Sequence, residues 1–97
     1  MAMRKVKNQP QNNFITELYG GENYVYLPLG DYLVAAPGIC GGRPIIKYHR
    51  LDARWILGYL KQGMSRQTLA KNFDIPLAAI EEVVELQATY DYEKSYA

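Results

Sequence analysis

The stretch MSRQTLAKNFDIPLAAIEEVVEL, residues 64–86, decides the fold of the C-terminal half of this chain. Apolar residues recur at helical spacing on both sides of Asp74-Ile75-Pro76, which predicts two helices joined by a tight turn. Ser65 is a good N-cap for the first of them, and Asp74 tolerates the left-handed backbone that such turns require. Ala70 is the small residue that two steeply crossing helices need at their contact. The apolar shell around it comes from Leu69, Phe73, Ile75, Ile80 and Val83. The segment predicts a helix-turn-helix.

A further helix is expected before this motif. Leu51, Trp55, Ile56, Tyr59 and Leu60 repeat at helical spacing, which predicts that they line the buried side of a helix from Leu51 to Gln62. Asp52 is its expected N-cap, and Gly63 its stop. The last helix of the motif is expected from about Pro76 to about Tyr90.

The residues before the helices are β-prone. Short strands are expected at Tyr24–Leu29, Tyr32–Ala35 and Ile45–Tyr48. Pro28 cannot donate a ladder hydrogen bond, which predicts that the first of these is an edge strand. The connection over residues 37–44 is rich in glycine and proline. Its expected tight turn is formed by Gly41, Gly42 and Pro44.

These elements predict an α+β protein, mainly α. An N-terminal β-hairpin or small antiparallel sheet is followed by a three-helix unit that contains the helix-turn-helix. We expect residues 1–23 to be a flexible arm with a short amphipathic piece, FITELY at residues 14–19, whose type the sequence leaves undecided. Residues 24–90 form the single domain, and residues 91–97 an acidic and aromatic tail.

Composition excludes several classes of protein. The longest apolar runs span a few residues, so no membrane span is expected, and the basic, amide-rich start is not a secretory signal. Cys40 is the single cysteine and His49 the single histidine. They form neither an intrachain disulfide nor a zinc site. We expect a cytoplasmic protein without a cofactor. A lone cysteine and a lone histidine with no placed partner do not make a catalytic site, so no enzyme is expected.

Charge is distributed unevenly along the chain. Between Arg43 and Lys71 seven basic residues face one acid, Asp52, whereas from Phe73 onward six acids face Lys94 alone. Such a division suits nucleic acid, an oppositely charged protein or a second copy of the chain, and it is equally compatible with two solvated faces.

The predicted last helix is acidic on the face where DNA readout needs hydrogen-bond donors. Readout places the N-terminal part of that helix in the major groove, where Arg, Lys, Asn or Gln meets base edges. Here Glu81, Glu82 and Glu85 share the face opposite Ile80 and Val84. Carboxylates repel phosphate, so the sequence favours a helix-turn-helix that serves packing and protein contact.

The same helix is apolar over about half of its circumference, more than the stripe of ~100° that one core needs. This width favours a second contact surface, in a dimer or a partner groove, over the alternative of a longer helix packed beneath the hairpin. The candidate partner-binding residues are Leu77, Glu81, Glu82, Glu85, Leu86 and Tyr90.

The segment PGICGGRPII, residues 37–46, resembles the domain-of-unknown-function 433 family. The resemblance continues through Arg50-Leu51, Ile56-Leu57, Leu60, Gly63-Met64-Ser65 and Ile80, and it covers about Tyr32 to Tyr90. Where the family usually has Gly-Thr-Arg, this chain has Tyr48-His49-Arg50. The resemblance implies a β-hairpin with a winged-helix-like or homeodomain-like helical unit, often dimeric. It also implies kinship with antitoxins that pair with nuclease-like toxins, and it carries over no catalytic residue.

We therefore expect a non-enzymatic interaction protein of antitoxin type that acts as a homodimer. Its acidic last helix and tail would cover the basic, RNA-binding face of a nuclease-like toxin. The alternative is a helix-turn-helix DNA-binding regulator that uses basic residues outside its acidic helix. The candidate nucleic-acid-binding residues are Arg4, Lys5, Lys7, Arg43, Lys47, Arg50 and Arg54.

Overall fold

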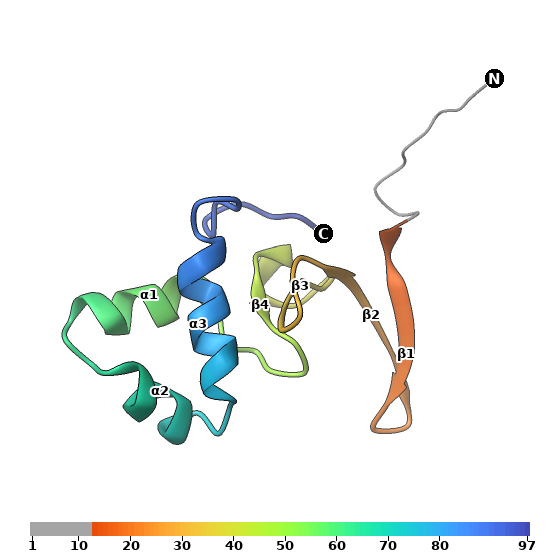
Figure 1. Ribbon diagram of the computed structural model, residues 1–97. Coiled ribbons are helices and arrows are strands. Elements are labelled where there is room, and N and C mark those ends of the chain that lie inside the picture. Colours follow the sequence, from red (N-terminus) through yellow and green to blue (C-terminus); the bar gives the residue numbers. More distant parts are fainter. Residues whose placement is uncertain (1–12) are drawn as a thin grey trace.

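A computed structural model describes residues 13–97, which form a four-stranded antiparallel sheet followed by three helices (Figure 1). The expected fold class is confirmed. The strands are β1 (Ile15–Tyr19), β2 (Glu22–Pro28), β3 (Leu33–Ala35) and β4 (Ile45–Ile46), and they pair in that order. A short 3-10 turn, η3 (Cys40–Gly42), separates β3 from β4. The helices are α1 (Ala53–Lys61), α2 (Arg66–Asn72) and α3 (Leu77–Leu86).

The amphipathic piece of undecided type is strand β1. It pairs with β2 in a hairpin that runs from the pair Ile15–Tyr26 to the pair Tyr19–Glu22. Gly20 and Gly21 close the hairpin with φ angles of 62° and 81°, a backbone conformation in which glycine costs least. The last residues of the expected N-terminal arm are therefore part of the sheet.

Two expectations about the strands are corrected. Strand β2 lies between β1 and β3, so it is not an edge strand. Pro28 is tolerated because it pairs with Val34 of β3 beyond the end of the pairing with β1. Strand β4 ends at Ile46 and not at Tyr48, because Tyr48 has a φ of 68° and the chain turns.

The helix caps predicted from the sequence are confirmed. The Asp52 carboxylate accepts a hydrogen bond from Arg54 N, and the Ser65 hydroxyl accepts one from Thr68 N. Asp74 lies in the left-handed region with a φ of 54°. Pro76 is the residue before the helix and not its first residue, since its ψ is 144°.

Helix α3 ends at Leu86, four residues earlier than expected. The chain turns there, since Thr89 N and Tyr90 N both donate to Leu86 O. The turn brings Tyr92 back into the core, where its hydroxyl donates to Val83 O at 2.6 Å. Burial raises the pKa of the Tyr92 phenol, which keeps the hydroxyl in its donating form.

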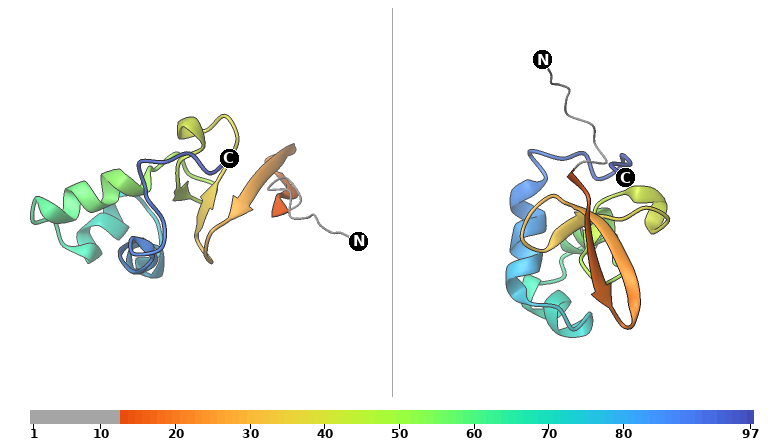
Figure 2. Two further views of the ribbon diagram at one scale, coloured as in Figure 1. Left: turned by 90° about the horizontal axis from the view of Figure 1, so that it is seen from above. Right: turned by 90° about the vertical axis from the view of Figure 1, so that its right-hand side faces the viewer.

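A main apolar core joins the helices to the inner strands, and a second buried cluster of Tyr26, Val34, Ala36 and Ile45 lies among the strands. The helical part of the main core lies where the sequence predicted it, around the contact between α2 and α3. The largest fully buried side chains are those of Leu33, Ile45, Ile56, Leu69, Ile80, Val34, Val83 and Pro44. Figure 2, seen from above, shows the helices at one end of the molecule, the inner strands in the middle and β1 at the other end.

Candidate functional site

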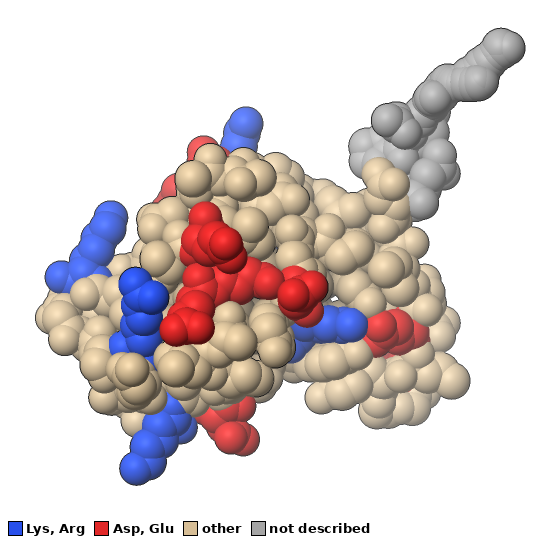
Figure 3. All heavy atoms as spheres, viewed as in Figure 1, with Lys and Arg blue, Asp and Glu red and all other residues tan. Residues whose placement is uncertain are grey.

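Helix α3 presents an acidic face to solvent. Glu81 and Glu85 are both exposed, and neither forms an ion pair within residues 13–97. Figure 3 shows Asp and Glu side chains gathered over α3 in the middle of this view, with Lys and Arg toward the end formed by α1 and α2. The acidic face predicted from the sequence is thus present, with two of its three glutamates free of cations in the described chain.

Glu82, the third glutamate, has a structural partner. The backbone N–H groups of Asp31, Tyr32 and Leu33 each donate to its carboxylate at 2.8 Å. Gly30 allows this approach, because a Cβ there would lie 2.6 Å from Glu82 Oε1. Glu82 therefore fixes the loop between β2 and β3 onto α3. Sequence reasoning missed this role because the two segments lie about 50 residues apart.

Of the apolar residues predicted to contact a partner, two are packed against the protein's own core and one is not. Leu86 and Tyr90 are half-buried and pack against the main core, and the Tyr90 hydroxyl donates to Leu29 O at 3.3 Å. These two residues therefore pack within the described chain, but α3 is not the longer helix of the alternative interpretation, since it ends at Leu86. Leu77, the first residue of α3, is half-buried. It precedes Glu81 by four residues, about one turn of the helix. Leu77, Glu81 and Glu85 remain the candidates for contact with a partner.

Two of the basic candidates converge on one buried carboxylate. Asp52 is 6% exposed, and its Oδ2 lies 3.2 Å from Arg43 Nε and 3.3 Å from Arg54 Nε. Arg54 also donates from Nη1 to Glu93 Oε1 at 2.8 Å, and this hydrogen bond raises the pKa of Arg54. Arg50 is exposed and has no ion pair in the part of the chain that the structure describes.

A cavity of about 320 Å³ lies beside this charge cluster. We name it the arginine–aromatic cavity; its lining consists of Cys40, Arg43, Arg50, Leu51, Asp52, Arg54, Trp55, Tyr59 and Phe73. Trp55 is 57% exposed, which corrects the expectation that it lies on the buried side of α1. Tyr59 and Phe73, which also line the cavity, pack against each other with their ring centroids 5.7 Å apart.

The remaining basic candidate in the described chain, Lys47, belongs to a cluster at the hairpin. Lys47 Nζ lies 3.0 Å from Glu17 Oε2, and the hydroxyls of Tyr26 and Tyr48 also donate to the Glu17 carboxylate. These three donors lower the pKa of Glu17 from 4.5 to about 2, with Tyr26 the largest cause. The Tyr19 and Tyr48 rings stack with centroids 4.2 Å apart. This polar–aromatic cluster ties the hairpin to the turn after β4.

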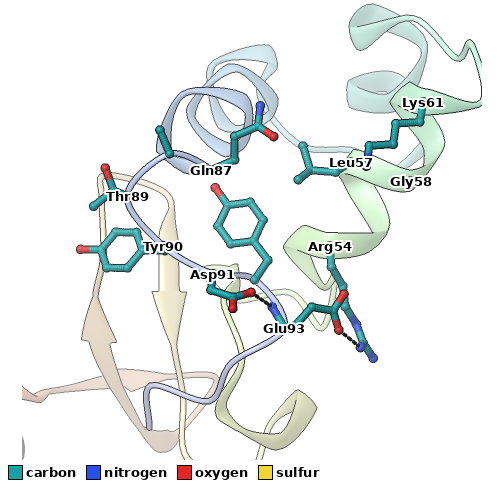
Figure 4. Close-up of a pocket in the computed structure, with 11 residues that line it drawn as sticks. Arg54, Leu57, Gly58, Lys61, Gln87, Thr89, Tyr90, Asp91 and Glu93 are labelled. Atoms are coloured by element: carbon teal, nitrogen blue, oxygen red, sulfur yellow. Dashed lines mark hydrogen bonds and ion pairs between the residues drawn. The ribbon is translucent and has the colours of Figure 1, made fainter.

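A second hollow, of about 560 Å³, lies between α1 and the segment after α3 (Figure 4). Arg54 and Glu93 meet across it, and Glu93 N donates to Asp91 Oδ1 at 2.9 Å. The Arg54–Glu93 pair thus ties the acidic tail to α1.

The expected glycine turn is present. Gly41 and Gly42 have φ angles of 65° and 78°, and Pro44 is buried behind them. A Cβ on Gly42 would lie 2.4 Å from Ala97 O, and Gly42 O accepts a hydrogen bond from Tyr96 N. The glycine turn therefore also contacts the C-terminal residues of the chain. Cys40 Sγ donates to Arg50 O at 3.4 Å, which holds the Arg50 backbone beside η3.

Three predicted residues and two classes of site need separate mention. Arg4, Lys5 and Lys7 lie outside the described residues. No three His, Cys, Asp or Glu side chains within residues 13–97 are placed to hold a metal ion. None of the helices in that range is long and apolar enough to span a membrane.

Comparison with known proteins gives one finding. A family model described as "Protein of unknown function (DUF433)" matches residues 33–85, more than half of the chain. The match runs from the start of β3 to the penultimate residue of α3, so the hairpin of β1 and β2 lies outside it. No curated protein and no solved structure matches the chain.

Proposed function

Because the chain belongs to the DUF433 family, whose description names no activity, we propose its function from its surfaces: it is a non-enzymatic interaction protein of antitoxin type. The observation that carries the proposal is the pair of exposed glutamates, Glu81 and Glu85, on one face of α3 without cations in the described chain. The partner is a protein with a basic surface, such as the RNA-binding face of a nuclease-like toxin. Charge complementarity of this kind speeds association and selects the partner.

A charge reversal tests this proposal. The full chain is expressed together with the protein encoded beside it, and the affinity of the purified pair is measured by isothermal titration calorimetry. Glu85→Lys is expected to weaken binding at least tenfold, because like charges then meet across the interface. Glu22→Lys, the same reversal at the exposed end of the hairpin, is the matched control and is expected to change little. Failure of the pair to bind, or equal affinity of both variants, overturns the proposal.

The functional unit that we propose is a homodimer, and the hairpin supports it. Strand β1 is at the edge of the sheet, and Leu18 on it is 80% exposed, with Val25 of β2 38% exposed. Natural proteins usually protect such an apolar edge with charges or prolines. The one charged side chain of β1, Glu17, is already bound to Lys47. An antiparallel pairing of β1 with its copy in a second chain would cover this edge.

Sedimentation velocity tests the dimer. The wild-type chain is expected to sediment as a dimer at micromolar concentration and Leu18→Lys as a monomer. Gln62→Lys, the same charge placed on an exposed residue at the end of α1, is expected to leave the dimer intact. A monomeric wild-type chain contradicts this part of the proposal.

Nucleic-acid binding is the second candidate function. Arg50 favours it, because it is exposed, has no ion pair in the described chain and lies beside Arg43 and Arg54. Phosphate contacts supply most of such an affinity, so it falls with salt. In a mobility-shift assay at low salt, Arg50→Ala is expected to weaken binding and Arg66→Ala on α2 to serve as the control. Absence of a shift at low salt eliminates this function.

A further inference from the structure

The geometry points to a binding site for one unpaired nucleotide in the arginine–aromatic cavity, with its base on Trp55 and its phosphate on Arg50. This inference rests on the second candidate function, nucleic-acid binding, and adds to it which form of nucleic acid is bound. It is independent of the acidic face of α3.

The cavity carries an excess of positive charge. Three guanidinium groups, those of Arg43, Arg50 and Arg54, line it together with one carboxylate, Asp52. Asp52 accepts a hydrogen bond from Arg43 Nε and forms an ion pair with Arg54, whose Nε lies 3.3 Å from Asp52 Oδ2, and Arg50 has no carboxylate partner in the described chain. Glu93, paired with Arg54 Nη1, is the second carboxylate of this cluster, so one anion beside Arg50 would complete the charge balance. Guanidinium groups hold phosphate oxygens with paired, charge-assisted hydrogen bonds.

The aromatic side of the cavity suits a base. Trp55 is the single tryptophan of the chain, and its large ring is more than half exposed. Its position is defined by α1, a helix capped by Asp52, and Tyr59 stands one turn further along the same helix against Phe73. An exposed ring on a rigid helix is a stacking platform, since every base has a π-face.

The size of the cavity limits the ligand. A volume of about 320 Å³ is at the small end of ligand sites, which span roughly 300–1,000 Å³. It admits one base with its phosphate. The face of a base is accessible only where the base is not stacked in a duplex, so the ligand is a single strand, a loop or an end. Single-stranded DNA and RNA share this chemistry.

The intrinsic fluorescence of the full chain tests the site directly, because excitation selective for tryptophan reports on Trp55 alone. Titration with short oligothymidylate and with short oligouridylate is expected to quench the emission. The two strands distinguish DNA from RNA as the preferred source. Inorganic polyphosphate, which offers charge without a base, is expected to leave the emission unchanged. Equal quenching by polyphosphate overturns the stacking inference.

Variants separate the two halves of the site. In anisotropy titrations with a fluorescent single strand, Trp55→Ala is expected to weaken binding about tenfold and Trp55→Phe much less, since the phenyl ring still stacks. Arg50→Ala is expected to weaken binding, Arg50→Lys to retain part of it, and Arg66→Ala to match the wild type. Equal affinity of Trp55→Ala and the wild type overturns the inference.

The affinity for a duplex of matched length distinguishes the single-strand site from nucleic-acid binding in general. Tighter binding of the single strand supports the cavity. Binding of the duplex without preference for the single strand overturns the cavity and leaves nucleic-acid binding in place. Absence of binding to either form overturns both.

Discussion

The two ends of this molecule are held by different forces. The helical end is built around fully buried side chains such as Ile56, Leu69 and Ile80. The hairpin of β1 and β2 leaves Leu18 and Val25 exposed on one side and is tied on the other by the polar–aromatic cluster around Glu17. Burial of large apolar side chains fixes the helical end, whereas the hairpin is anchored by one buried ring, that of Tyr26, and by the hydrogen bonds around Glu17.

Asp52 and Glu17, the two carboxylates with several polar partners, differ in the same way. Asp52 is buried, caps α1 and binds two arginines, so removing it leaves two half-buried guanidinium groups without their counter-ion and a helix without its cap. Glu17 binds Lys47 and two tyrosine hydroxyls, and of these three partners only Tyr26 is buried. Similar contacts therefore stabilise the whole fold in one place and only the local attachment of an element in the other.

The largest effect is expected in the helical core. Ile80→Ala leaves a cavity at the contact of α2 and α3, which should lower the free energy of unfolding by about 3 kcal/mol. Denaturation with urea measures it. Leu18→Ala removes a side chain of similar size from the hairpin, where it is 80% exposed, and should change the free energy of unfolding by less than about 0.5 kcal/mol at a protein concentration at which the chain is monomeric. Equal losses from both variants would contradict the contrast between the two ends.

Asp52 comes next. Asp52→Ala removes an N-cap and leaves two half-buried arginines without their carboxylate, for an expected loss of about 2 kcal/mol. Asp52→Ser retains a capping oxygen without the charge and should recover part of this loss. Urea denaturation of both variants separates the cap from the ion pairs. Equal stability of the serine and alanine variants would assign the whole effect to the charge.

Glu82 tests how the strands are joined to the helices. Glu82→Ala leaves three backbone N–H groups, two in the loop before β3 and one on its first residue, Leu33, without their acceptor, and the free energy of unfolding is expected to fall by about 1–2 kcal/mol. Thermal unfolding followed by circular dichroism measures it. Glu81→Ala is the matched control one residue away, where the side chain is exposed. A loss from the Glu81 variant as large as that from Glu82 would show that helix charge and not the loop contact is responsible.

The helices and their caps could be predicted from the sequence, whereas the contacts between segments far apart in the sequence could not. Caps at Asp52 and Ser65 and the left-handed Asp74 follow from local residue preferences, so they were correctly predicted. The end of α3 was misplaced because the pattern of apolar residues continues beyond Leu86, while the chain itself turns so that Tyr92 can enter the core.

The candidate site shows the same limit. The basic and acidic segments could be read along the chain, but the pairing of Arg43 and Arg54 on one carboxylate depends on how η3 meets α1. Trp55 was assigned to the buried side of α1 because its spacing is that of a core residue. Spacing along one helix does not reveal which of its residues a neighbouring element covers, so the exposure of Trp55 and the cavity beside it could be seen only in the structure.

Titration of Glu17 is expected to change the stability of the whole fold least and to change the NMR signals of the hairpin alone. Its pKa is lowered from 4.5 to about 2 by the hydroxyls of Tyr26 and Tyr48 and the ammonium of Lys47. A depressed carboxyl pKa stabilises the folded hairpin above pH 4.5, and this contribution is lost as the pH falls from 4.5 toward 2. Amide NMR signals of β1 and β2 around Glu17 should therefore shift with a midpoint near pH 2, the pKa of this carboxyl in the folded chain.

The variant Glu17→Gln fixes the uncharged state at every pH. At pH 6 its hairpin signals should resemble those of the acidified wild type, while the signals of the helical end and the urea midpoint stay where they are in the wild type, because no buried group has changed. Glu22→Gln, a second carboxyl of the same hairpin without an ion pair in the described chain, is the control and should leave the transition in place. Helices and hairpin that respond together would mean that the two ends form one cooperative unit, and the contrast between them would then concern solvent exposure alone.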